Sequence, residues 1–188
     1  METTFFMIRH AESLFVFGQE RIRKLSEQGE IEANNIKERL KQEKIDVIVS
    51  SPYTRAIQTI EGIANERKME ITIFEGLKER SIKGAYKIPA EEIERAIKKS
   101  YSVKDYCLPG GETTRQAQER AIPVIKQLLN EYKGKNIVVG THGSIMTIMM
   151  NYFDEQYGYV FWKSTTKPDV YKLSFSENEL INVKRLWE

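Results

Sequence analysis

The chain has 188 residues, of which 40% are hydrophobic and 30% charged, a composition ordinary for a folded domain with a substantial core. Its 29 basic and 27 acidic residues leave a net charge of only +2, with the two signs interleaved, which argues against a nucleic-acid-binding surface. The single Cys107 cannot form an internal disulfide, and no apolar stretch approaches the ~20 residues that span a bilayer. We therefore expect one domain, residues 1–188, in a cytoplasmic protein that binds neither nucleic acid nor membrane; nothing indicates its oligomeric state.

Short apolar runs alternate with helical patterns along the chain. The predicted strands are residues 4–8, 46–50, 71–74 and 136–140, and the predicted helices are 27–44, one opened by Ser51-Pro52, one opened by Pro89, 113–132 and 143–154. Strands that alternate with helices favour a parallel sheet covered on both faces. Alternating apolar residues on either side of residues 176–178 favour a closing antiparallel hairpin. The predicted fold is a three-layer α/β/α sandwich with a mainly parallel central sheet and a C-terminal hairpin.

Three local signals concern helix ends. Ser51 is predicted to cap the helix whose first residue is Pro52. Thr113 and Gln116 have the spacing of a capping box. Pro123 lies well inside the helix that follows, where it removes a backbone hydrogen bond, so a kink or break is expected there.

The only two histidines occur in matching settings. His10 and His142 each follow an apolar strand-like run and precede a residue with little or no side chain. Ligands bind beyond the carboxyl ends of the strands in an open parallel sheet, so two strands that end in histidine bring both imidazoles to one pocket. Arg9 beside His10 suggests that the pocket holds an anion.

Two further features strengthen the anion hypothesis. Arg55 falls one turn into the helix after the second strand, near the same sheet edge. Residues His142-Gly143-Ser144 end a strand and start a helix, whose free backbone N–H groups form a natural anion cradle. Together these groups predict a site of the size of a phosphate.

A metal site is the alternative interpretation of two histidines and a carboxylate. The chain lacks His-x-His, His-Glu-x-x-His and Cys-x-x-Cys spacing, and the flanking arginines would repel a cation. It also lacks the glycine-rich loops of nucleotide-binding folds. We therefore expect neither a metal nor a cofactor.

A series of motifs resembles the histidine phosphatase superfamily, the phosphoglycerate-mutase-like proteins, in the family's order and over most of the chain. The matching segments are residues 9–13 (Arg-His-Ala-Glu-Ser), 25–29 (Leu-Ser-Glu-Gln-Gly), 50–59 (Ser-Ser-Pro-Tyr-Thr-Arg-Ala-Ile-Gln-Thr), 77–80 (Leu-Lys-Glu-Arg), 109–112 (Pro-Gly-Gly-Glu) and 141–143 (Thr-His-Gly). Each motif alone is weak, and the ordered set is specific. The resemblance implies the family's phosphoglycerate-mutase-like fold.

The resemblance also implies roles for individual residues. His10 would be the nucleophile that carries a phosphoryl group, and Glu79 the acid that protonates the leaving oxygen. The phosphate would be held by Arg9, Arg55, His142 and the start of the helix at Gly143. Ser13, like Ser144, either donates to the phosphate or caps its local turn. Glu112, which precedes a helix, is interpreted as a capping carboxylate.

The chain departs from the family pattern at two places. Ala11 replaces the usual glycine of the first motif, and alanine accepts a positive φ less readily. Val16 stands where the family often has an asparagine that contacts phosphate. One polar phosphate contact is therefore expected either to be lost or to be supplied by Gln19, Arg21 or Arg23.

The predicted function is metal-independent hydrolysis of a small phosphorylated metabolite through a phosphohistidine on His10. A cofactor-dependent phosphoglycerate mutase is the second hypothesis; the family's mutases are longer, with extra inserts and a C-terminal tail, and this chain stops soon after its final hairpin. A non-catalytic module that binds a phosphorylated ligand is the third, suggested by Ala11 and Val16. Residues 81–109 are expected to form a cap over the pocket that sets substrate specificity.

Overall fold

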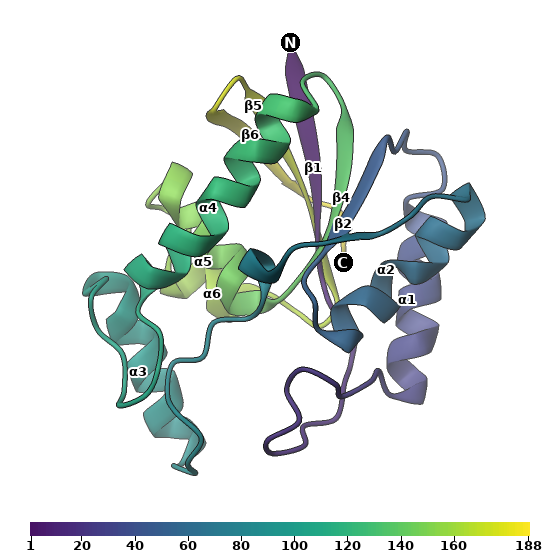
Figure 1. Cartoon of the computed structure of the whole chain (residues 1–188). Helices are drawn as coiled ribbons and strands as arrows, with labels where there is room; N and C mark the ends of the chain where they lie inside the picture. Colours follow the sequence, from purple (N-terminus) through teal and green to yellow (C-terminus); the bar gives the residue numbers. More distant parts are fainter.

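A computed structural model describes residues 1–188 as one mixed sheet with helices on both faces (Figure 1). The strands are β1 (Glu2–Arg9), β2 (Val47–Ser50), β3 (Thr72–Ile73), β4 (Asn136–Thr141), β5 (Asp169–Ser176) and β6 (Glu179–Arg185). Their order in the sheet is β3-β2-β4-β1-β5-β6. Strands β1 to β4 pair in parallel, whereas β5 runs antiparallel to both β1 and β6. The predicted α/β/α sandwich with a C-terminal hairpin is thereby confirmed.

Strand β1 lies inside the sheet, and its side chains alternate between two cores. Phe5 and Met7 pack into one apolar cluster, and Phe6 and Ile8 into another on the opposite face. All four are almost fully buried. A strand buried on both faces has an uninterrupted apolar sequence. The run Thr4–Ile8 has this pattern, and the strand predicted from it is present.

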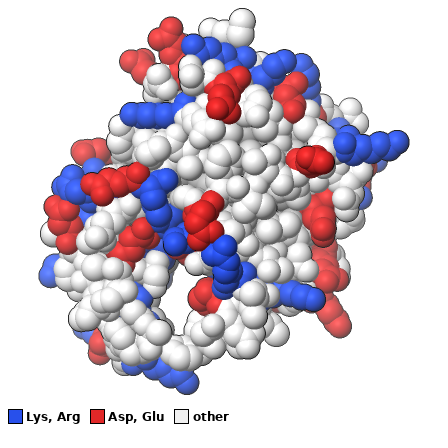
Figure 2. Space-filling view, in the orientation of Figure 1, with Lys and Arg blue, Asp and Glu red and all other residues white.

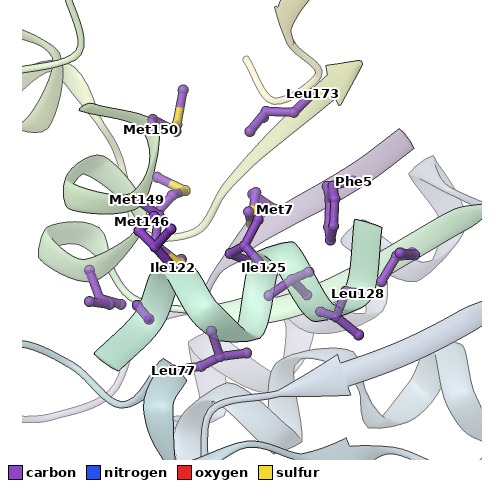
Figure 3. Close-up of a cluster of buried hydrophobic side chains, with 14 of the residues drawn as sticks. Phe5, Met7, Leu77, Ile122, Ile125, Leu128, Met146, Met149, Met150 and Leu173 are labelled. Carbon is purple, nitrogen blue, oxygen red and sulfur yellow. The ribbon is translucent and has the colours of Figure 1, made fainter. Parts of the chain in front are cut away.

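The helices form the two outer layers. They are α1 (Glu27–Arg39), α2 (Thr54–Arg67), α3 (Ala90–Ser102), α4 (Thr114–Glu131), α5 (Gly143–Phe153) and α6 (Tyr159–Ser164), with a 3₁₀ turn, η1, at Glu75–Leu77. Helices α1 and α2 cover one face of the sheet, and α4 and α5 cover the other. Figure 3 shows Met146 and Met149 of α5 near Met7 and Ile122 in this second core, with Met150 above them. Helix α6 was not predicted.

Helix α3 stands apart from the sheet, at the lower left of Figure 1. It lies within residues 81–109 and has a small apolar cluster of its own, built on Ile82, Ala96 and Ile97. Tyr159 and Trp162 of α6 pack against this cluster. The segment predicted to form a cap therefore has a core separate from the two that enclose the sheet.

Two local predictions about helices are corrected. Helix α2 begins at Thr54 with Tyr53 as its N-cap, so neither Ser51 nor Pro52 starts it. The Ser51 hydroxyl instead bonds the Tyr53 N–H and the His142 ring. Helix α4 continues through Pro123, so a break, the stronger form of the expectation, is absent, and its buried residues on both sides of Pro123 pack against α5 and the sheet. By contrast, the capping box of Thr113 and Gln116 is present as predicted.

Charged residues of both signs are scattered over the face seen in Figure 2 and do not form a single basic patch. None of the helices has the length and apolar character needed to cross a membrane.

Gly29 allows helix α1 to pack against the loop after β1. It is buried, and a Cβ at this position would lie 2.1 Å from the Glu12 carbonyl oxygen. We predict that Gly29→Ala lowers the free energy of unfolding by about 1–3 kcal/mol, because a methyl group must be forced against backbone. Gly62→Ala, on the exposed face of α2, should instead raise it by about 0.5–1 kcal/mol. Urea denaturation of both variants measures the difference; equal effects would contradict this account of Gly29.

Candidate active site

The carboxyl ends of β1, β2 and β4 bring the predicted site residues together. Parallel pairing places Arg9 opposite Thr141 and Ser50 opposite Gly140, so His10 and His142 leave the sheet at the same level. Their ring centroids lie 5.2 Å apart, with the rings inclined at 62°. Both side chains are buried. The shared pocket for the two imidazoles is thus a direct result of strand order and register.

The tautomer of His10 follows from its hydrogen bonds. Its Nδ1 lies 2.7 Å from the carbonyl oxygen of Ala11, and a carbonyl can only accept, so Nδ1 carries the proton. The other ring nitrogen, Nε2, accepts a hydrogen bond of 3.2 Å from Arg55 Nε. A neutral imidazole with a fixed ring and a lone pair on Nε2 is the form required of a nucleophile.

The surroundings of His10 keep its ring neutral. Burial lowers the pKa of His10 well below its ordinary value, and the positive charge of Arg55 lowers it further. The hydrogen bond to Ala11 acts in the opposite direction and is outweighed. Protonation of His10 would place a second cation directly against Arg55.

His142 is held through Ser51. Its Nε2 lies 2.7 Å from the Ser51 hydroxyl oxygen, which also accepts the Tyr53 N–H. The Ser51 hydroxyl has a second lone pair, so it can donate to Nε2 or accept from it, and the bond is compatible with either tautomer of His142. His142 Nδ1 is buried and has no hydrogen-bond partner. Burial first, and then the field of the neighbouring cations, lowers the pKa of His142 well below its ordinary value.

Arg55 is almost wholly buried and has partners on three sides. Nε donates to His10, Nη1 to the Glu20 carbonyl oxygen, and Nη2 to the Glu20 carboxylate at 3.2 Å. The guanidinium also lies over the ring of Tyr53, 4.9 Å from its centroid. Glu20 therefore holds one edge of a guanidinium whose other edge touches the proposed nucleophile.

Arg9 reaches the same end of the sheet from the last position of β1. Its Nη1 donates to the backbone oxygen and the hydroxyl of Thr165, while its Nε is buried without a partner. A Cβ on Gly143 would lie 2.7 Å from Arg9 Cζ, so only glycine permits this close approach. Gly143 thus has a steric role in addition to starting α5.

The N-terminus of α5 holds a carboxylate of the protein itself. Glu79 accepts hydrogen bonds from the N–H groups of Ser144 at 3.1 Å, Ile145 at 2.8 Å and Arg80 at 2.8 Å. As predicted, the backbone N–H groups at this helix start bind an anionic group, and that group is the Glu79 carboxylate. The three donors fix the Glu79 carboxylate at the start of α5, close to His142.

The two departures in the first motif have different consequences. Ala11 is buried and does not have a positive φ, so the concern about replacing glycine does not apply. Val16 is exposed in the loop after β1 and supplies no polar contact. Of the three candidate replacements, Arg21 pairs with Glu75 at the surface, and Gln19 is exposed. Arg23 is largely buried and close enough to lower the pKa of both His10 and Arg55.

Ser13 and Glu112 are engaged in local structure. The Ser13 hydroxyl donates to the Lys24 carbonyl at 2.6 Å, which braces the loop. Glu112 forms a two-pronged ion pair with Arg120, at 2.6 and 2.8 Å. No group of three or more His, Cys, Asp or Glu side chains is placed to hold a metal ion.

Sequence reasoning missed three contributors to the site: Glu20, Ser51 and Thr165. Glu20 lies in a loop with no regular structure, so no periodicity marks it. Ser51 belongs to a quoted motif but was assigned to helix capping. Thr165 is 156 residues from Arg9, and nothing local connects the two.

The buried histidines predict a dependence of stability on pH. Both pKa values are lowered in the folded chain, so below about pH 6.5 the unfolded chain binds protons that the folded chain does not. The free energy of unfolding should therefore fall by about 2.5 kcal/mol between pH 7 and pH 5.5. Urea denaturation across this range measures the fall, and His142→Asn should remove about half of it. An unchanged stability in the wild-type chain would contradict the burial of two neutral imidazoles.

Comparison with solved structures agrees with the fold. Mycobacterial glucosyl-3-phosphoglycerate phosphatase superposes with a TM-score of 0.78 at 17% identity, covering 98% of this chain and 97% of that one. A variant phosphoserine phosphatase from Entamoeba histolytica, in complex with phosphoserine, gives 0.77 at 20% identity, covering 97% and 96%. At these low sequence identities, the superpositions show that the chains share a fold and nothing further.

Comparison of sequences places the chain in a family. Phosphoglycerate mutase-like protein 4 of Arabidopsis thaliana is 27% identical over 172 residues, covering 87% of this chain and 69% of that protein. The model of the histidine phosphatase superfamily (branch 1) matches residues 5–184. The chain therefore belongs to branch 1 of the histidine phosphatase superfamily and is a phosphoglycerate-mutase-like enzyme.

Proposed function

We propose that this enzyme is a metal-independent phosphatase that hydrolyses a small phosphomonoester through a phosphohistidine on His10. The observation that carries the proposal is the state of His10: Nδ1 donates to Ala11, and Nε2 presents its lone pair toward Arg55. A histidine buried only for packing has no need of a guanidinium against its free nitrogen.

The reaction has two steps. His10 Nε2 attacks phosphorus, the bond from phosphorus to the ester oxygen breaks, and its electron pair leaves with that oxygen, which takes a proton. Water then attacks phosphorus, the P–N bond breaks, and the electron pair returns to Nε2 as phosphate forms. Because phosphoryl transfer spreads charge over three oxygens, positioning and charge stabilisation supply most of the catalysis.

Guanidinium groups and the second histidine supply that stabilisation. Arg9 Nε and His142 Nδ1 are buried without protein partners, and phosphate oxygens would satisfy both when His142 carries its proton on Nδ1. Arginine matches phosphate geometry through paired N–H groups. At Arg55, phosphate would replace the Glu20 carboxylate on Nη2, so binding exchanges one anion for another. Arg23 also contacts Glu20, so displacement of Glu20 would free the Arg23 guanidinium to bind the same phosphate.

Glu79 is the proposed proton donor. The N-terminus of α5 holds its carboxylate in place, and a phosphate dianion placed beside it would favour uptake of a proton. Protonated Glu79 can then pass that proton to the leaving oxygen. In the second step the same carboxylate can accept a proton from the attacking water.

Replacement of the nucleophile tests the reaction class. We predict that His10→Ala reduces hydrolysis of p-nitrophenyl phosphate by at least about a thousandfold, because no other side chain can form the covalent intermediate. Release of p-nitrophenol measures turnover, and acid quenching with a ³²P-labelled substrate detects phosphohistidine. The variant should remain folded by circular dichroism. Full activity in His10→Ala would overturn the proposal, and phosphate binding without turnover in the wild-type enzyme would favour a non-catalytic module.

The role of Glu79 is tested through the leaving group. We predict that Glu79→Gln slows hydrolysis of an alkyl phosphate by about 10²–10⁴-fold, because an alkoxide leaves poorly without an acid. The same variant should slow p-nitrophenyl phosphate far less, since p-nitrophenolate needs no proton. Glutamine keeps an oxygen to accept from Ile145 and Arg80. An equal loss on both substrates would contradict the role of Glu79 as proton donor to the leaving oxygen.

A phosphoglycerate mutase is the second candidate, favoured by the identity with the Arabidopsis mutase-like protein. Incubation with 3-phosphoglycerate, with and without 2,3-bisphosphoglycerate, separates the two activities. Free phosphate supports the phosphatase, and isomerisation that requires the bisphosphate supports the mutase.

A further inference from the structure

A cavity of about 550 Å³ opens beside the catalytic residues. Glu20, Tyr53 and Glu79 form its inner end. Its remaining walls come from the loop after β1 and from residues 80–85 with α3. Figure 2 shows a hollow at the lower part of this face, between that loop and the α3 side. The volume suits a small organic group.

The walls of this apolar cavity are mainly hydrocarbon. Phe15 and Phe17 line one side, and Ile82, Ile93 and Ile97 line the other. Phe15 is 71% exposed and Phe17 45%, in a chain that buries most of its large apolar side chains. Aromatic rings left exposed at the rim of a cavity are typical of a binding surface.

Only some of the polar groups in these walls have partners within the protein. Ser81 donates to the Lys83 carbonyl, and Lys83 Nζ donates to the carbonyls of Gly84 and Tyr86. Arg80 is buried and donates to Ser100 through Nη1, whereas its Nε and Nη2 have no partner. The lining is therefore mainly apolar, with the Arg80 guanidinium as its polar exception.

The position of the cavity determines which part of a substrate would enter it. Glu20, at its inner end, is bound to Arg55, the group assigned to the phosphate. Glu79, the proposed proton donor to the leaving oxygen, lies in its wall. An ester whose phosphate is on Arg55 and whose bridging oxygen faces Glu79 places its alcohol portion in this space.

A polar groove on the other side of Glu79 is the competing location. It shares Tyr53 and Glu79 with the apolar cavity, but it does not reach Glu20. Arg120 in this groove is paired with Glu112, and Lys78 and Glu119 add one charge of each sign. The groove offers little apolar contact, because only one of its lining residues is hydrophobic.

We propose that the enzyme acts on phosphomonoesters of apolar alcohols, with the hydrocarbon group in the apolar cavity between Phe15 and Phe17 and the isoleucines of the α3 side. This inference rests on the proposed phosphatase function, because it uses that function to place the phosphate. It assigns specificity to the loop after β1 together with the segment 81–109.

Alkylphosphonates, which bind without being hydrolysed, test the cavity separately from the chemistry. The Kd should fall about fourfold per added methylene from methyl- to hexylphosphonate, until the cavity is filled. Hexylphosphonate should bind at least about tenfold more tightly than 5-hydroxypentylphosphonate, which has the same length but a hydroxyl group at its end. Isothermal titration calorimetry measures each Kd. Affinity independent of chain length, or tighter binding of the hydroxyl analogue, would overturn the proposal.

Two variants assign the effect to the loop. Phe15→Ser/Phe17→Ser should weaken hexylphosphonate by about tenfold and leave methylphosphonate within about twofold, because only the longer chain reaches the rings. Leu14→Ser is the matched control, since Leu14 is 69% exposed in the same loop but does not line the cavity. An equal effect of Leu14→Ser would contradict the assignment.

Turnover distinguishes failure of the inference from failure of the phosphatase proposal. Hexyl phosphate should be hydrolysed with a kcat/KM at least about tenfold above that of glycerol 1-phosphate, also an ester of a primary alcohol. Tight binding of hexylphosphonate without hydrolysis of hexyl phosphate would contradict the proposed phosphatase function but support the apolar cavity as a binding site for hydrocarbon groups. Hydrolysis of both esters at equal rates, together with phosphonate affinity that is independent of chain length, would contradict the proposed role of the cavity but support the phosphatase function.

Discussion

The parallel pairing of β4 between β1 and β2 is the constraint on which the site depends. It fixes three chain segments at one level: Arg9-His10 after β1, Ser50-Ser51 after β2 and Thr141-His142 after β4. Backbone hydrogen bonds continue this register beyond the strands, from His10 N–H to Thr141 and from Ser51 N–H to Gly140. A slip of one residue in any strand would turn a site residue to the other face of the sheet. The two apolar cores hold this register because each buries alternate residues of β1.

Charge balance in the pocket is the second organising feature. A buried guanidinium is costly unless an anion compensates it, and Arg55 has the Glu20 carboxylate. The start of α5 has Glu79 in the same way. These carboxylates lie where the proposed chemistry brings a phosphate, so the protein can keep strong anion-binding groups in place without leaving them uncompensated. The two acids would behave differently when substrate binds. Glu20 would be displaced from Arg55 by the phosphate. Glu79, fixed by three backbone donors, would remain in place and exchange a proton with the leaving oxygen and the attacking water.

In the proposed function, one loop would serve both the phosphate and the alcohol. Its polar end bears Glu20, which touches Arg55, and its apolar part bears Phe15 and Phe17, which line the cavity. Val16, the departure from the family pattern, lies between the two aromatic residues in sequence but does not line the cavity itself. Arg23 is the remaining polar neighbour of the histidine pair.

The sequence alone determined the strands, their parallel arrangement and the meeting of His10 with His142, because apolar runs and the residues after them are local signals. Through the ordered motifs it also predicted Arg9, Arg55 and Glu79 as site residues, and the structure places all three near this edge of the sheet. Only the tertiary structure decided the hydrogen-bonded state of each group. The Nδ1 proton of His10, the bond between Ser51 and His142, the closeness of Arg9 to Gly143 and the contact of Glu20 with Arg55 join residues far apart in the chain. The tertiary structure also decided that helix α4 continues through Pro123, since packing against α5 and the sheet outweighs one missing backbone hydrogen bond. Local pattern carries no information about such partners, because distance in space is set by the assembled sheet and its two cores.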